Sequence, residues 1–189
     1  MTRFAKPFCV SASVAVAAII GARIVSADQP RVSFVDATET VCTIVVPGEQ
    51  WVSGNGILHV RGQVRHDRVV PNPGQGDPRV NGWADLTADL EMDLATGDGS
   101  LAGSLQVTPI DPSYHGSFVG HFTAKLTGGL AVGRADAQGV GEFDGLKLSG
   151  TFANFVSNNS GSCPDESARP FPNLQTHVTG QIFDPSKKQ

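Results

Sequence analysis

Four side chains near the phenylalanine-rich part of this chain are candidates for chemistry: Trp83, His121, Glu142 and Asp144. An imidazole or carboxyl group facing an apolar interior has a shifted pKa, which suits it to acid–base chemistry or to holding a ligand. Trp83 could border the mouth of such an interior or cap the rim of the core. The alternative is an outward position, because His121, Glu142 and Asp144 are out of phase with the neighbouring phenylalanines. We therefore carry these four forward as candidate ligand-binding residues.

A second group of charged residues has strand spacing. Arg61 and Arg65 alternate with apolar residues on one expected strand, and Asp85, Asp89 and Asp93 do so on the next. Because the apolar faces must form the core, we expect these charges to pair across the strands on the outer, solvated face. A polar pocket that binds an anion is the alternative.

The sequence contains no pattern of a known metal or catalytic site. The five histidines are scattered, and the acidic run from Asp85 to Asp98 lacks the spacing of a calcium loop. There is no G-x-S-x-G motif, and Gly54-Asn55-Gly56 precedes a strand and not a phosphate-binding helix. We expect no cofactor and no intrinsic metal, and the catalytic residues, if any, stay unknown.

Residues 1–27 have the pattern of a secretory signal peptide. Arg3 and Lys6 precede an apolar stretch, and Val25-Ser26-Ala27 fits the small-x-small cleavage rule. A membrane anchor is the alternative, but Ser11, Ser13 and Arg23 interrupt the apolar run, which is short of the roughly 20 residues that span a bilayer. We expect cleavage, a secreted or periplasmic protein, and no stable membrane insertion afterwards.

Removal of residues 1–27 makes the chain more acidic. The net charge of −4 becomes −7, because three of the 14 Lys and Arg residues and none of the acidic ones lie in that segment. Nucleic acid is therefore not expected as a partner, since phosphate binding needs clustered Lys and Arg. The oligomeric state cannot be read from the sequence.

Two cysteines, Cys42 and Cys163, remain after cleavage. An even pair in an oxidising compartment predicts one disulfide, with two separate buried thiols as the alternative. The bridge would tie an early strand to an irregular segment at 156–174. It would also leave neither cysteine free to act as a catalytic thiol.

The rest of the chain alternates between apolar and polar residues with a period of two, which indicates strands and almost no helix. We expect a single domain: an N-terminal extension at 28–39, a β-domain at 40–184 that includes the loop at 156–174, and a solvated tail at 185–189. About eight strands are expected, at 40–46, 57–70, 80–94, 101–108, 114–126, 130–135, 139–155 and 175–183.

Residues 139–155 are predicted to form one long strand with glycines at the points where it must coil. The apolar phase changes after Gly145, so we expect a β-bulge there. Glycine at strand interiors favours a closed antiparallel β-barrel, whose curvature needs local bends, over a two-sheet sandwich, the remaining alternative.

The runs Gly116-Ser117-Phe118-Val119-Gly120-His121-Phe122 and Gly139-Val140-Gly141-Glu142-Phe143-Asp144-Gly145 resemble the late strands of the allene oxide cyclase-like and dirigent-like barrels. The resemblance covers residues 114–152 best and 54–155 loosely. It implies an eight-stranded barrel with a central cavity. Members of that superfamily cyclise or isomerise apolar small molecules, steer the coupling of phenolic radicals, or have no known activity. No functional residue of the family can be matched to a position here.

Three functions are open at this stage. The first is binding of a small apolar ligand in the lumen of a secreted barrel, without catalysis. The second is an isomerase or cyclase of the allene oxide cyclase-like type, and the third is a structural or surface role without a ligand. A buried acid–base pair in the lumen would favour the enzyme, an apolar cavity of roughly 300 Å³ or more would favour binding, and a filled lumen would exclude both.

Overall fold

A computed structural model of the chain describes residues 32–157, 162–165, 169–171 and 173–186. The expected signal peptide at 1–27 lies outside these ranges. The described residues form nine strands and one 3₁₀ turn, η1 (Pro78–Val80). The strands are β1 (Val32–Val46), β2 (Glu49–Val52), β3 (Ile57–Pro71), β4 (Gly82–Asp93), β5 (Gly99–Pro109), β6 (Gly116–Thr127), β7 (Leu130–Gly141), β8 (Lys147–Val156) and β9 (Leu174–Phe183).

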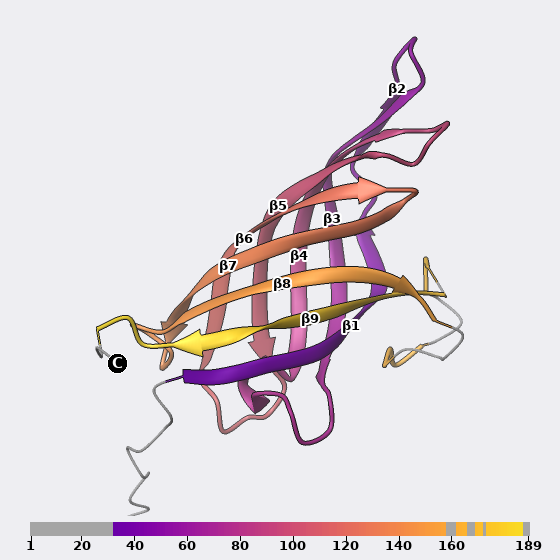
Figure 1. Cartoon of the computed structure of the whole chain (residues 1–189). Coiled ribbons are helices and arrows are strands. Elements are labelled where there is room, and N and C mark those ends of the chain that lie inside the picture. The colour runs from indigo at the N-terminus through magenta and orange to yellow at the C-terminus, as the bar shows by residue number, and fades with distance from the viewer. Residues whose placement is uncertain (1–31, 158–161, 166–168, 172, 187–189) are drawn as a thin grey trace, which may run out of the picture.

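Eight of the strands close into an antiparallel barrel. Neighbours follow the order β1-β9-β8-β7-β6-β5-β4-β3, and β1 pairs with β3 to close the ring. β2 pairs with the first residues of β3 alone, and the two form a hairpin that projects beyond the barrel (Figure 1). The prediction of an all-β, closed antiparallel barrel of about eight strands is confirmed.

The first strand is longer than the sequence pattern indicated. β1 begins at Val32, which pairs with Phe183, and its pairing with β9 continues to Thr40 opposite Gln175. Residues 32–39, expected as an extension outside the domain, are therefore part of the barrel wall. Val35 and Ala37 are buried, but the alternation is hidden because the apolar Phe34 is 72 % exposed and the polar Glu39 faces the lumen.

The expected single strand at 139–155 is wrong, and so is the bulge at Gly145. The segment is the end of β7, a tight turn and β8, with Gly141 and Gly145 at φ +68° and +84° in the turn. Phe143, between them, folds back into the barrel and stacks on Phe118 with ring centroids 5.0 Å apart. A Cβ at Gly139 would lie 2.0 Å from the carbonyl oxygen of Phe143, so this glycine makes room for the turn.

The structure has a β-bulge in β3, and there it reverses which residues face the lumen. Val60 pairs with Leu90 and Gln63 with Ala88, so one extra residue lies in β3 at Arg61-Gly62. Gly62 has φ +66°, and its N–H donates to Asp89 Oδ1 at 2.8 Å. Even-numbered residues face the lumen before the bulge and odd-numbered residues after it, because an extra residue exchanges the two faces of the strand.

The barrel is sealed at one end. Phe118, Phe143, Val80 and Ile182 are at most 2 % exposed and belong to one core cluster. Val80 is the last residue of the turn η1 in the loop between β3 and β4, which lies below the strands in Figure 1. This loop holds an ion pair between Asp77 and Arg79, and the Asp77 N–H donates to the Phe34 carbonyl of β1 at 3.1 Å.

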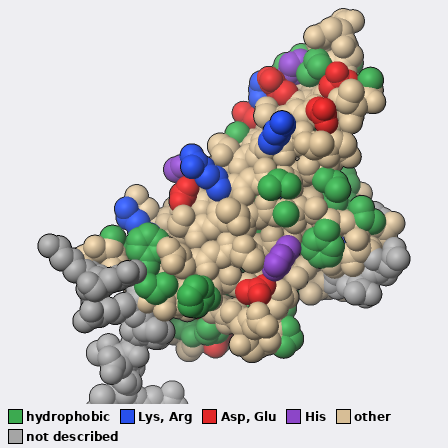
Figure 2. Space-filling model, viewed as in Figure 1, with side chains coloured by type: hydrophobic (Ala, Val, Ile, Leu, Met, Phe, Trp, Pro, Cys, Tyr) green, Lys and Arg blue, Asp and Glu red, His purple; other side chains and the backbone are tan. Residues whose placement is uncertain are grey.

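Lumen-facing side chains become partly exposed towards the other end, where the β2–β3 hairpin projects. On β4, Ala84, Leu86 and Ala88 are buried, whereas Leu90 and Met92 are half-buried. Acidic, basic and histidine side chains mix on the projecting strands, and no large patch of one charge appears on the face shown in Figure 2.

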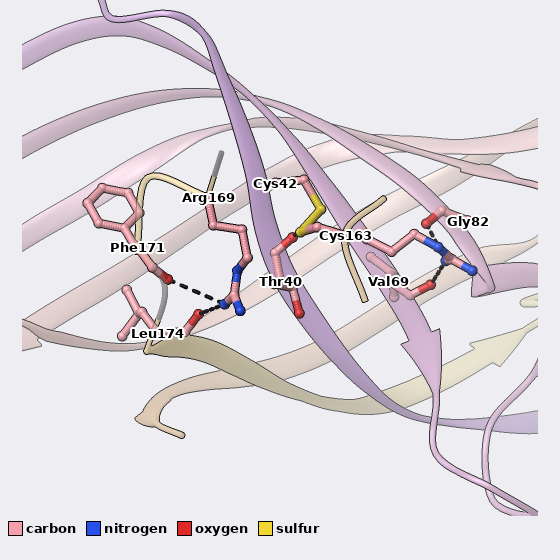
Figure 3. Close-up of a disulfide and its surroundings, with 9 residues drawn as sticks. Thr40, Cys42, Val69, Gly82, Cys163, Arg169, Phe171 and Leu174 are labelled. Atoms are coloured by element: carbon pink, nitrogen blue, oxygen red, sulfur yellow. Dashed lines mark hydrogen bonds between the residues drawn. A yellow bond between two sulfur atoms is a disulfide. The ribbon is translucent and has the colours of Figure 1, made fainter. Parts of the chain in front are cut away.

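The predicted disulfide between Cys42 and Cys163 is present. Cys42 is the extra residue of a second bulge, between Val41 and Thr43 of β1. Figure 3 shows the bridge reaching from β1 to the segment that carries Cys163. In the same segment, Nη2 of Arg169 donates to the carbonyl oxygens of Phe171 and Leu174 at 3.3 and 3.4 Å. The described parts of the β8–β9 connection are thus fastened to the barrel wall.

Candidate functional site

The barrel lumen contains a cavity of about 100 Å³. Its wall is mostly apolar and includes Val35, Val69, Leu86, Leu105, Phe122 and Phe152. Leu101 and Leu174 also line it and are half-buried, so the cavity opens at the end away from Phe118 and Phe143. The lumen is therefore neither filled by side chains nor as large as a typical ligand pocket of roughly 300 Å³ or more.

Charged side chains from β1 and β3 form one side of this lumen. Glu39 and Arg65 line the cavity, and Asp67, two residues after Arg65 on the same face, is fully buried. Nη2 of Arg65 donates to Asp67 Oδ2 at 2.7 Å and lies 3.8 Å from Glu39 Oε1. We call Glu39, Arg65 and Asp67 the lumen cluster. It combines two carboxyl groups with one guanidinium beside a mostly apolar space.

The electrostatics of the lumen cluster favour a neutral Asp67. Burial raises the pKa of this carboxyl well above its usual range, Arg65 lowers it, and the negative charge of Glu39 raises it again. Removing the Asp67 carboxylate from water costs more free energy than its attraction to the one neighbouring cation returns. In the folded protein Asp67 therefore retains its proton to a higher pH than an exposed aspartate.

Two polar atoms of the lumen cluster have no hydrogen-bond partner among the described residues. They are Nε of Arg65 and Oδ1 of Asp67, and both are buried. A buried polar atom without a partner costs free energy, and in native proteins it often marks a place where a ligand or an ordered water binds. A further polar pair lies beside Glu39: Thr176 of β9 is paired with Glu39 of β1, and its Oγ1 donates to Asn154 Oδ1 at 3.0 Å.

None of the four candidate residues from the sequence lies in the lumen. His121 is exposed on the outer face of β6, and Glu142 and Asp144 are exposed in the β7–β8 turn. Their polar atoms serve local structure: Glu142 accepts from the His115 N–H at 3.0 Å, and Asp144 from the Gly145 N–H at 3.0 Å. The structure therefore does not bring these three side chains together.

Trp83, the fourth candidate, lies on the outer face of β4. Its ring stacks on His66 with centroids 4.3 Å apart, and the Arg68 guanidinium lies 5.8 Å from its centroid. His66 in turn contacts Asp85 at 2.6 Å. Trp83 thus belongs to a cross-strand ladder on the barrel surface and borders no part of the cavity.

The expectation of outer ion pairs between two strands is right for Arg61 and wrong for Arg65. Arg61 contacts Glu91 and lies 3.8 Å from Asp89, on the outer face. Arg65 follows the bulge at Gly62 and points into the lumen instead. Asp93 is not part of these pairs, because its side chain accepts from the Ala95 N–H at 2.7 Å in the β4–β5 turn.

Sequence reasoning therefore missed the lumen cluster. Strict alternation along β3 assigns Arg65 and Asp67 to the solvent face, and the signal that could have corrected it is a glycine within an otherwise regular strand pattern, at Gly62. Glu39 was missed because the start of β1 was placed one residue after it.

Within the described ranges, no three His, Cys, Asp or Glu side chains are placed to hold a metal ion. No helix in those ranges is long and apolar enough to cross a membrane. Comparisons of the chain with protein-family models, with curated proteins and with solved structures find no match. The resemblance to allene oxide cyclase-like barrels accordingly stays a prediction.

Proposed function

We propose that this protein is an exported β-barrel that binds a small apolar molecule in its lumen. The observation that carries this function is the cavity of about 100 Å³ with an apolar wall, sealed at the Phe118 end and open at the other. Removal of an apolar surface from water favours binding by roughly 25 cal/mol per Å². A cavity of this size suits one small ring or a short alkyl chain, or the end of a longer molecule whose remainder lies at the mouth.

Export is supported by the Cys42–Cys163 bond, since disulfides persist in oxidising compartments, and by the signal-peptide pattern at 1–27.

Binding is tested with a small aromatic hydrocarbon, isopropylbenzene, titrated into the protein while amide NMR shifts are followed. We expect saturable shifts at residues of the cavity wall. Ala135 lines the cavity on β7, so Ala135→Leu should fill it and abolish the shifts. Ala102→Leu, at an exposed position on β5, adds the same atoms outside and should leave binding intact. A folded wild-type protein that shows no saturable shifts would exclude the proposed function.

One observation favours a second candidate, an isomerase or cyclase. The lumen cluster provides a buried acid, Asp67, beside a carboxyl group that lines the cavity, Glu39, and such a pair can move protons to and from a bound molecule. Deuterium exchange at the methyl group of acetophenone in D₂O tests this chemistry. An enzyme of this kind should accelerate the exchange, Glu39→Gln should abolish it, and binding without acceleration would leave the first function alone.

A further inference from the structure

The hydrogen-bonding capacity of Arg65 is only partly used in the lumen. Its Nη2 group serves Asp67 and approaches Glu39. Nε has no hydrogen-bond partner among the described residues, and Nη1 donates no hydrogen bond to any of them. A guanidinium has five N–H donors and no acceptor, so what it lacks can be supplied only by an oxygen or another acceptor.

Arg65 lies beside the cavity in which we propose that the ligand binds. Its side chain lines the cavity and is 16 % exposed, while the walls of the cavity are mostly apolar. Water competes weakly in such a space, so a hydrogen bond from a charged donor is stronger there than at the surface. A purely hydrocarbon ligand would leave these donors unsatisfied and would lose part of the free energy gained by its burial.

The charges of the lumen cluster limit which acceptor fits. Glu39 already supplies a carboxylate to the guanidinium, at 3.8 Å. Burial keeps Asp67 neutral to a higher pH than usual, so that Arg65 and Glu39 balance one another. A ligand carboxylate would bring a second negative charge into the same low-dielectric space, close to Glu39, which is unfavourable. A neutral oxygen adds no charge.

We propose that the ligand is a small apolar molecule that carries a neutral carbonyl-type oxygen, which accepts a hydrogen bond from Arg65 inside the barrel. This inference rests on the proposed binding function and specifies the ligand class for that same cavity. The apolar wall contacts the hydrocarbon part of the ligand, and Arg65 on the β1–β3 side of the lumen donates to its oxygen.

Three probes of nearly equal shape test the inference: isopropylbenzene, acetophenone and benzoate. They differ in having a methyl group, a carbonyl oxygen or a carboxylate at matched positions. We expect acetophenone to bind about tenfold more tightly than isopropylbenzene, which is the range for a hydrogen bond to a charged group, and benzoate to bind more weakly than acetophenone. Dissociation constants come from the same NMR titration.

Variants assign the effect to Arg65. Arg65→Leu should remove the advantage of acetophenone and retain binding of isopropylbenzene. Arg61→Leu, on the outer face of the same strand, should retain the advantage. If Arg65→Leu does not fold because Asp67 loses its partner, the double variant Arg65→Leu/Asp67→Leu replaces the buried pair by apolar volume and should give the same result.

The outcomes separate the two proposals. Equal affinity of the wild-type protein for isopropylbenzene and acetophenone would overturn the ligand class and leave the binding function standing. Tighter binding of benzoate than of acetophenone would overturn the requirement for a neutral oxygen. Binding of none of the three by folded protein would overturn the binding function and the ligand class with it.

Discussion

Nη2 of Arg65 lies 2.7 Å from Oδ2 of Asp67, its neighbour two residues further along β3. Residues two apart on a strand share a face, so this contact brings a cation and a carboxyl group together on the lumen side of the wall. On the lumen side of their strand, Val60 precedes Gly62, whereas Arg65, Asp67 and the apolar Val69 follow it. The position of Arg65 and Asp67 on the lumen side therefore depends on the bulge at Gly62.

The buried Asp67 predicts an unusual dependence of stability on pH. Because the fold raises the pKa of Asp67, the folded protein binds this proton more tightly than the unfolded chain does. The contribution of Asp67 to the free energy of unfolding therefore falls as the pH rises from about 4, the pKa of an unfolded aspartate, towards the raised value. Asp67→Asn should remove this loss, so the variant gains stability relative to wild type between pH 4 and 7 in urea unfolding.

Asp36 provides a control of opposite sign. A hydrogen bond from His177 lowers the pKa of Asp36, so its contribution is present above pH 4 and is lost as the pH falls through the lowered value. Asp36→Asn should lose stability relative to wild type at pH 7 and not at low pH. Parallel pH profiles for Asp67→Asn and wild type would contradict the assignment of a raised pKa to Asp67.

The bulge predicts that Gly62 is specifically required. With φ at +66°, an L-residue at this position is strained even though no atom lies within 4 Å of a Cβ placed there. Gly62→Ala should lower the free energy of unfolding by about 1–2 kcal/mol. Gly54→Ala is the matched control, because Gly54 has equal space and no positive φ, and it should change stability little. Similar losses in both variants would show that the backbone at Gly62 is not the cause.

The strand pattern allowed the barrel to be predicted, because most strands keep one apolar face from end to end. β4 is the clearest case, with Ala84, Leu86 and Ala88 buried and their neighbours exposed. Alternation carries no information on backbone φ, however. A glycine such as Gly62 fits a regular strand and a bulge equally well, and the choice depends on Asp89 of the next strand.

The candidate site could not be predicted from the sequence for the same reason. A change of face at Gly62 decides whether Arg65 and Asp67 meet solvent or the lumen, and Gly62 marks where the face can change without deciding whether it does. At Phe143 the opposite error arose: Gly and Phe alternate as in a strand, yet Gly141 and Gly145 form a turn that places this phenylalanine in the core. Both errors concern glycines with positive φ.

The sealed end of the barrel predicts a large effect of one ion pair. Asp77 accepts from Nε and Nη2 of Arg79 and from Ser33, and both charged side chains are less than 10 % exposed. Asp77→Ala leaves the buried guanidinium of Arg79 without its partner, which should cost about 3–5 kcal/mol in urea unfolding. Asp85→Ala, at a half-exposed outer pair with His66, should cost less than about 1 kcal/mol. Equal, small losses would show that the η1 loop is not needed to seal the barrel.

The disulfide predicts how much stability depends on the oxidising compartment. Cys42 and Cys163 are 121 residues apart, and closing a loop of this length in the unfolded chain is worth about 4–5 kcal/mol in the chain-entropy model. Cys42→Ala/Cys163→Ala should lose a stability of this size, measured by urea unfolding. Wild-type protein treated with a reductant should unfold at the same urea concentration as the double variant, because both lack the bond.

Intact-mass analysis that finds two free thiols in protein purified from an oxidising compartment would contradict the pairing. Since β9 pairs with β1 beside Thr40, the variant should still form the barrel, and its cavity should still bind isopropylbenzene at low temperature.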